Sequence, residues 1–134
     1  MHKFVQPPNA AKPVSPFSMG VISGGFLFVS GQAPLNLQTN QIEYADIKSE
    51  VRHCLSNIQT ILEAAGCTLR DVVRVGVFLN DLADVPAMNE VYREFFPENS
   101  PARTTVGVQL PKFKVEIDCI ARIPETEPSA LSTK

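Results

Sequence analysis

The segment from Asn99 to Ile123, NSPARTTVGVQLPKFKVEIDCIARI, decides the fold because it contains two β-strand patterns separated by a short turn. Side chains alternate between the two faces of a strand, so the first pattern has one mostly apolar face and one polar face. The apolar face carries Ala102, Thr104, Val106, Val108 and Leu110. The polar face carries Arg103, Thr105, Gly107 and Gln109.

The second pattern alternates in the same way. Its apolar row consists of Phe113, Val115, Ile117, Cys119, Ala121 and Ile123, and its other row begins with Lys114, Glu116 and Asp118. We predict that the two strands pair as an antiparallel hairpin around Pro111-Lys112 with their apolar rows aligned. Such a hairpin would place Arg103, Thr105, Glu116 and Asp118 on one face.

Arg103 has two interpretations at this stage. It can lie at the protein surface or pair with a carboxylate such as Asp118. Alternatively, the rigid fork of its guanidinium, beside the hydroxyl groups of Thr104 and Thr105, suits a small carboxylate ligand.

The N-terminal half predicts a hairpin followed by a long helix. Residues 17–22 and 26–31 have strand character, and Gly24-Gly25 between them supports a tight turn. Apolar residues then recur at helical spacing from Ile47 to Ala65, with Asp46 as a candidate N-cap and Gly66 as a stop signal.

The C-terminal half begins with residues 71–80, an apolar and β-branched run that is typical of a strand covered on both faces. Asp84 can cap a second helix, which Pro97 ends. Adding the closing hairpin gives the order β-β-α-β-α-β-β.

This order predicts an α+β fold in which two helices cover one face of a mixed sheet. The chain offers no further helix for the other face, and an uncovered apolar sheet face indicates self-association. We predict a single domain over residues 1–134 with a core at about 15–123. An extended, proline-rich lead-in precedes this core, and a loose polar tail follows from about Glu125.

Composition narrows the function classes. The net charge is −2 with 19% charged residues, so the sequence indicates no basic surface for nucleic acid. No apolar run is long enough to span a membrane, and the N-terminus lacks the apolar segment of a signal peptide. The three cysteines are scattered, which favours reduced thiols in the cytoplasm over disulfides or a metal site.

Seven motifs follow one another between about Ser15 and Ile123, namely SPFSMGV, LFVSGQAPLN, the helix ending EAAG, DVVRVGVFLNDLAD, MNEVYREFF, PARTTVGV and VEIDCIA. Together they resemble the Rid family of reactive-intermediate deaminases, also called YjgF-like proteins. The resemblance implies a chorismate-mutase-like α+β sandwich that assembles as a homotrimer with clefts between subunits.

The resemblance also implies a site and a reaction. Arg103 would bind the substrate carboxylate, Asn89 would line the cleft, and Glu116 would position water with the backbone of Gly31 and Thr105. The substrates would be 2-imino acids and their 2-enamino precursors, which water converts to 2-keto acids and ammonia. No cofactor would be needed, because the protonated imine is already electrophilic at C2.

Two positions depart from the family pattern. Phe17 stands where many members have a tyrosine, and Thr105 stands where many have a cysteine. Glu116 also has an alternative role as an ion-pair partner of Arg103 or Lys114. The alternative functions are a non-catalytic module that binds a 2-keto acid, an RNA-cleaving activity that the net charge disfavours, and a chaperone-like role.

Overall fold

The computed structural model describes residues 1–125 and has the predicted α+β architecture, with two helices on a mixed sheet. Its strands are β1 (Lys3–Val5), β2 (Gly20–Ser23), β3 (Phe26–Gln32), β4 (Leu35–Asn36), β5 (Gln41–Ile42), β6 (Val72–Leu79), β7 (Ala102–Gly107) and β8 (Val115–Arg122). Its helices are α1 (Ile47–Ala64) and α2 (Val85–Phe95), with short 3₁₀ turns at Leu69–Asp71 and Leu82–Asp84. The predicted loose tail lies almost wholly outside the described residues.

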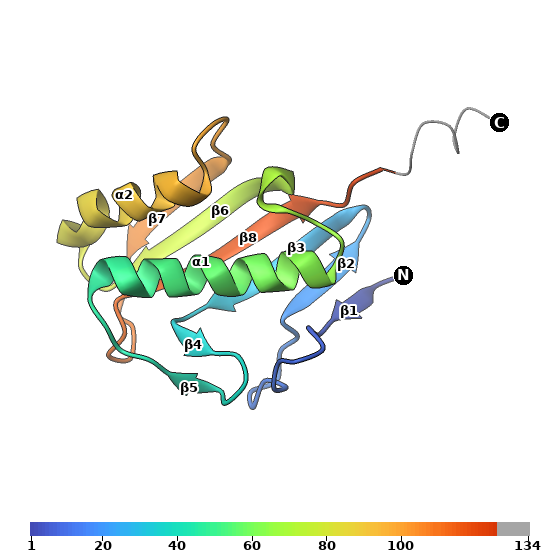
Figure 1. Ribbon diagram of the computed structural model, residues 1–134, viewed down its shortest axis with the longest axis horizontal. Helices are drawn as coiled ribbons and strands as arrows, with labels where there is room; N and C mark the ends of the chain where they lie inside the picture. The colour runs from blue at the N-terminus through green and yellow to red at the C-terminus, as the bar shows by residue number, and fades with distance from the viewer. Residues whose placement is uncertain (126–134) are drawn as a thin grey trace.

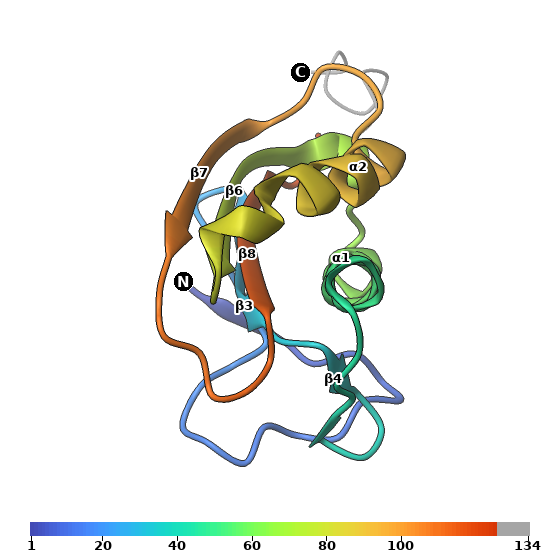
Figure 2. The ribbon, with the colours of Figure 1, turned by 90° about the vertical axis from the view of Figure 1, so that its left-hand side faces the viewer.

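Six strands form the main sheet in the order β1-β2-β3-β8-β6-β7. Only β6 and β7 run parallel, and all other neighbours are antiparallel. Figure 1 shows both helices crossing this sheet, and the turned view in Figure 2 shows that they lie on the same side of it. Strands β4 and β5 form a separate two-stranded ribbon.

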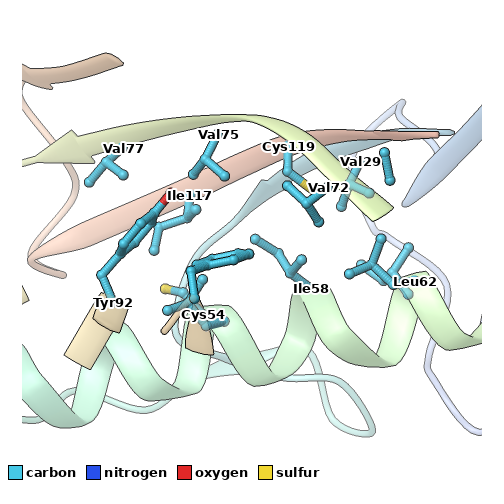
Figure 3. Packing of buried hydrophobic residues seen from close by; sticks show 14 of the residues in the cluster. Val29, Cys54, Ile58, Leu62, Val72, Val75, Val77, Tyr92, Ile117 and Cys119 are labelled. Atoms are coloured by element: carbon cyan, nitrogen blue, oxygen red, sulfur yellow. The ribbon is translucent and has the colours of Figure 1, made fainter. Parts of the chain in front are cut away.

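Helix α1 begins and ends where the sequence predicts. The Asp46 side chain accepts a hydrogen bond from the backbone N–H of Ser49 at 2.8 Å, which caps the helix. Gly66, just after the helix, has a φ of 79°, a conformation that glycine adopts without strain. The buried face of α1 packs on the sheet, as Figure 3 shows for Cys54, Ile58 and Leu62.

Helix α2 forms as predicted, but its cap differs. Asp84 makes no capping hydrogen bond through its side chain. Asp81 instead accepts from the backbone N–H of Ala83 and caps the preceding 3₁₀ turn. This turn carries the chain from β6 into α2, so that Met88, Val91 and Tyr92 of α2 reach the core.

The first hairpin also follows the prediction, with one addition. Gly24 and Gly25 have φ values of 62° and 83°, and Ser23 pairs with Phe26 across this tight turn. The lead-in contains strand β1, which pairs with β2 and buries Val5 in the core. Because this edge strand has only three residues and is followed closely by Pro7 and Pro8, it is too short to show a period, and the sequence pattern did not reveal it.

The predicted closing hairpin is wrong. Strand β7 does not pair with β8, because β6 lies between them. β7 follows β6 through helix α2, and a strand–helix–strand connection of this kind makes its two strands parallel. The segment from Val108 to Lys114 then crosses to the other side of β6, where β8 pairs antiparallel with both β6 and β3.

The sheet face opposite the helices has no cover among residues 1–125. A row of paired residues crosses it from β1 to β8, namely Phe4, Val21, Phe28 and Ile120. Phe28 is 44% exposed, and Val106 of β7 is 38% exposed. The prediction that β6 is covered on both faces is therefore wrong for the single chain, whereas the prediction of an uncovered apolar face is confirmed.

Candidate functional site

The six residues predicted for the site fall into two groups in the chain. We call Arg103, Asn89 and Thr105 the arginine group, and Glu116, Gly31 and Phe17 the glutamate group. The arginine group lies at the edge of the sheet where β7 meets α2. The glutamate group lines a hollow formed by the loop before β2, the end of β3 and β8.

Arg103 extends from β7 towards helix α2. Its Nη1 donates a hydrogen bond to Oδ1 of Asn89 at 2.9 Å and contacts Sδ of Met88 at 3.9 Å. Its Cζ lies 4.8 Å from the centre of the Tyr92 ring. Within residues 1–125, no carboxylate lies within 4.0 Å of its guanidinium, so its charge is balanced by no ion pair there.

Register explains why Arg103 faces the helices. Arg103 pairs with Val75 of β6, and Thr105 pairs with Val77. Both valines are buried beneath the helices, so their partners on β7 point to the same side. Thr105 is half-buried there, and its hydroxyl is enclosed without a hydrogen-bond partner among residues 1–125.

Glu116 lies against the backbone of Gly31. A methyl group on Gly31 would lie 2.9 Å from Cδ of Glu116 and closer still to a carboxylate oxygen, so only glycine leaves room. The pairing of β3 with β8 shifts between Val29 and Gln32, which makes Gly31 part of a β-bulge. Gly31 is therefore explained by this close approach, because its φ is not positive.

The Glu116 carboxyl has a raised pKa. Burial is the main cause, because half-removal from water disfavours the charged form. The negative charge of Asp118, two residues along the same face, adds to the rise. Glu116 makes no ion pair within the described chain, and Lys114 instead approaches Oε2 of Glu50 at 3.8 Å.

Phe17 lies before β2 and not within it, contrary to the prediction. It is 49% exposed and lines the same hollow as Gly31 and Glu116, which has a volume of about 480 Å³. Pro16 and Ser18 flank it, and the Ser18 carbonyl accepts a hydrogen bond from the hydroxyl of Ser30. This bond ties the loop that carries Phe17 to the bulge that carries Gly31.

The prediction that Arg103, Thr105, Glu116 and Asp118 share a face is wrong. Glu116 pairs with Phe78 on β6. The neighbours of Phe78, Val77 and Leu79, are buried beneath the helices, so Phe78 and its partner Glu116 point to the opposite, uncovered face. Asp118 shares that face and accepts a hydrogen bond from the N–H of Gly76 at 3.1 Å. Asp118 is therefore no ion-pair partner for Arg103.

Met88 and Tyr92 contact Arg103 but were not predicted as site residues, because apolar side chains at helical spacing are typical of a core-facing stripe. The spacing of these residues could have indicated the contact. Met88 and Tyr92 are four residues apart on α2 and Asn89 lies between them, so a side chain that contacts Asn89 can also reach Met88 and Tyr92. Within residues 1–125, no group of three or more His, Cys, Asp or Glu side chains is placed to bind a metal.

Comparison with known proteins identifies the family. The family model described as Endoribonuclease L-PSP matches residues 7–123. The chain belongs to this family. A RutC family protein from Pyrococcus horikoshii is 49% identical over 115 residues, covering 84% of this chain and 91% of that protein. A 2-iminobutanoate/2-iminopropanoate deaminase from Dermatophagoides farinae is 38% identical over 123 residues, covering 90% of this chain and 96% of that protein.

Solved structures agree with the family and the fold. A Rid protein family member from Yersinia pestis superposes with a TM-score of 0.85 at 32% identity, covering 92% of this chain and all of that one. Escherichia coli TdcF with bound serine superposes with a TM-score of 0.81 at 38% identity, covering 90% and 98%. The resemblance to the Rid family is thus confirmed. Neither described helix of this Rid-family chain is long and apolar enough to cross a membrane.

Proposed function

We propose that this Rid-family protein hydrolyses reactive 2-imino acids, and their 2-enamino precursors, to 2-keto acids and ammonia. The observation that carries this proposal is Arg103, which is held by Asn89 and Tyr92 but has no carboxylate partner among the described residues. An oriented guanidinium with an uncompensated charge is suited to a substrate carboxylate. The deaminase name of the Dermatophagoides relative supports the same reaction.

In this proposal, Glu116 handles the proton of the attacking water. The raised pKa of its carboxyl moves it towards the working pH, as a general base requires. Water adds to C2 of the protonated imine as Glu116 accepts its proton. The carbinolamine then collapses to the 2-keto acid as the proton passes to the departing ammonia. The Gly31 carbonyl and the Thr105 backbone lie in the two groups that would hold this water.

The proposal requires two subunits for each site. Arg103 and Glu116 point to opposite faces of one sheet, so a single chain does not present both to one small molecule. A homotrimer in which the arginine group of one copy meets the glutamate group of the next would bring them together. The uncovered apolar face, with Phe28 and Val106 exposed, supports such an assembly.

A second candidate function is a module that binds a 2-keto acid without turnover. Phe17 favours it, because a phenyl ring in the hollow offers no hydrogen bond to a water or to the substrate nitrogen. The same anchor, Arg103, would serve in both cases.

A trapping assay separates the two functions. A dehydratase generates 2-iminopropanoate or 2-iminobutanoate in place, and the lifetime of each imine is compared with and without the protein. We expect the protein to shorten both lifetimes. Arg103→Lys should lose nearly as much activity as Arg103→Ala, because lysine keeps the charge but not the two-pronged geometry. If no imine is hydrolysed while 2-oxobutanoate binds through Arg103, the binding module is the function.

A further inference from the structure

Tyr92 lies directly beneath the guanidinium of Arg103. The Cζ atom of Arg103 is 4.8 Å from the centre of its ring, and Tyr92 is only 5% exposed. The neighbouring ring of Phe96, 4.8 Å away and tilted by 39°, packs against Tyr92 and restricts its movement. The face of an aromatic ring is negative, so this position attracts a cation.

The hydroxyl group of Tyr92 does not explain the presence of this ring. Figure 3 shows its oxygen pointing from α2 towards Val75, Val77 and Ile117 of the sheet. That oxygen is enclosed and has no hydrogen-bond partner within the described chain. Burial also raises the pKa of Tyr92 to about 12, so the phenol stays neutral at working pH. Tyr92 therefore offers Arg103 the face of its ring.

The contacts of Arg103 occupy one part of its guanidinium and leave another free. Asn89 and Met88 both contact Nη1, and the Tyr92 ring covers one flat side. Within residues 1–125, both hydrogen bonds of the Arg103 side chain come from Nη1, and none comes from Nε or Nη2. These two nitrogens form an edge that can bind both oxygens of a carboxylate at once.

We propose that Tyr92 is a positioning residue that orients Arg103 so that its Nε–Nη2 edge faces the substrate carboxylate. The inference rests on the proposed function, because it takes Arg103 to be the carboxylate anchor. A ring suits this task better than an acidic side chain. An aspartate or glutamate at the same place would also orient the guanidinium, but it would neutralise the charge that attracts the substrate.

The test alters the charge distribution of the ring while keeping its shape. Position 92 is replaced by phenylalanine and, through an expanded genetic code, by 3,4,5-trifluorophenylalanine, whose ring face is no longer negative. The dissociation constant of 2-oxobutanoate is measured for each protein by calorimetry. We expect Tyr92→Phe to bind like the unmodified protein. The trifluoro variant should bind about three- to tenfold more weakly, because it loses the cation–π attraction.

A double-mutant cycle shows whether the effect passes through Arg103. In an Arg103→Ala background, exchange of phenylalanine for its trifluoro analogue should leave the weakened binding unchanged. Turnover should show a raised KM with an unchanged kcat, since the carboxylate is held equally in the ground state and the transition state. A purely structural role would alter the melting temperature without this pattern, so melting and light scattering serve as controls.

Three outcomes would overturn the inference. Equal affinity in the phenylalanine and trifluoro variants would exclude the ring face. Equal weakening in both would assign the effect to the hydroxyl group. Weakening that persists unchanged in the Arg103→Ala background would show that Tyr92 does not act through Arg103. If Arg103→Ala alone binds 2-oxobutanoate normally, the anchor is wrong and the proposed function fails with it, whereas the first three outcomes leave that function intact.

Discussion

A mixture of two inactive variants should regain activity if each site is shared between neighbouring subunits. The variants are Arg103→Ala, which loses the proposed carboxylate anchor, and Glu116→Ala, which loses the proposed proton-transfer group. Arg103 points to the helix side of the sheet and Glu116 to the uncovered side, so the two lie on opposite faces of one subunit. In a mixed assembly of the proposed trimer, some clefts would receive an intact Arg103 from one subunit and an intact Glu116 from the next.

The expected magnitude follows from the contacts. The free edge of Arg103 offers two charge-assisted hydrogen bonds of about 1.5–3 kcal/mol each, so Arg103→Ala should cost at least about 100-fold. Loss of a positioned base typically costs about 10²–10⁴-fold, so Glu116→Ala should be similarly weak. With equal amounts and random assembly, about one cleft in four contains both residues, which predicts roughly a quarter of full activity.

The assay measures loss of 2-iminobutanoate after the two variants have been unfolded together and refolded. Mass spectrometry of differently tagged subunits confirms that mixed trimers have formed. The matched control mixes Arg103→Ala with Asn89→Ala. These residues touch in one chain, at 2.9 Å, so no mixed cleft contains both intact and no activity should return. Mixed trimers whose activity merely averages that of the parent variants would refute the shared site.

Three further substitutions test the glutamate group. Gly31→Ala should displace the Glu116 carboxylate and lower kcat by about 100-fold, while circular dichroism stays unchanged, because the clash involves the end of a flexible side chain. Asp118→Asn removes a charge that raises the pKa of Glu116, so the loss of activity on acidification should move to lower pH. Phe17→Tyr should raise the rate on 2-iminopropanoate about three- to tenfold by adding one hydrogen bond, with no gain on the imine from leucine.

Full activity in Gly31→Ala would show that catalysis does not depend on the position of the Glu116 carboxylate against Gly31. If the loss of activity on acidification occurs at the same pH in Asp118→Asn, the group that titrates is not Glu116. If Phe17→Tyr raises the rate equally on both imines, the effect of the added hydroxyl group does not depend on the size of the substrate side chain, contrary to the prediction.

Local signals in the sequence were sufficient for most of the fold. The Asp46 cap, the Gly66 stop and the Gly24-Gly25 turn each depend on residues close in the chain, and each forms as predicted. The uncovered sheet face followed from counting helices. Glu116 and Gly31 were identified through the family motifs, and the structure adds the physical reason, which is the contact between them.

The neighbours of β7 could not be predicted from alternation. A period of two shows which residues share a face of a strand, but it does not show which strand lies beside it. Val106 and Thr104 made one row of β7 resemble a core face. In the edge strand, however, that row lies on the uncovered side, and Arg103 points to the helices. The deciding fact was the helical connection between β6 and β7, which makes them parallel neighbours.

The same strand order links assembly to the chemistry of Glu116. If a second copy covers the face that carries Phe28 and Ile120, it also removes water from Glu116, and this desolvation raises the pKa of its carboxyl further. The Arg103 guanidinium of that copy has the opposite effect, because a nearby positive charge favours the ionised carboxylate. A general base needs a balance between desolvation, which raises its pKa, and a nearby positive charge, which lowers it, because a carboxyl that stays protonated accepts no proton from water. In this proposed arrangement, Arg103 would both bind the substrate and keep the Glu116 carboxyl ionised. Once the substrate carboxylate is bound, it would neutralise part of the charge of Arg103. The pKa of Glu116 would then rise again, towards the range in which a carboxylate accepts a proton most readily.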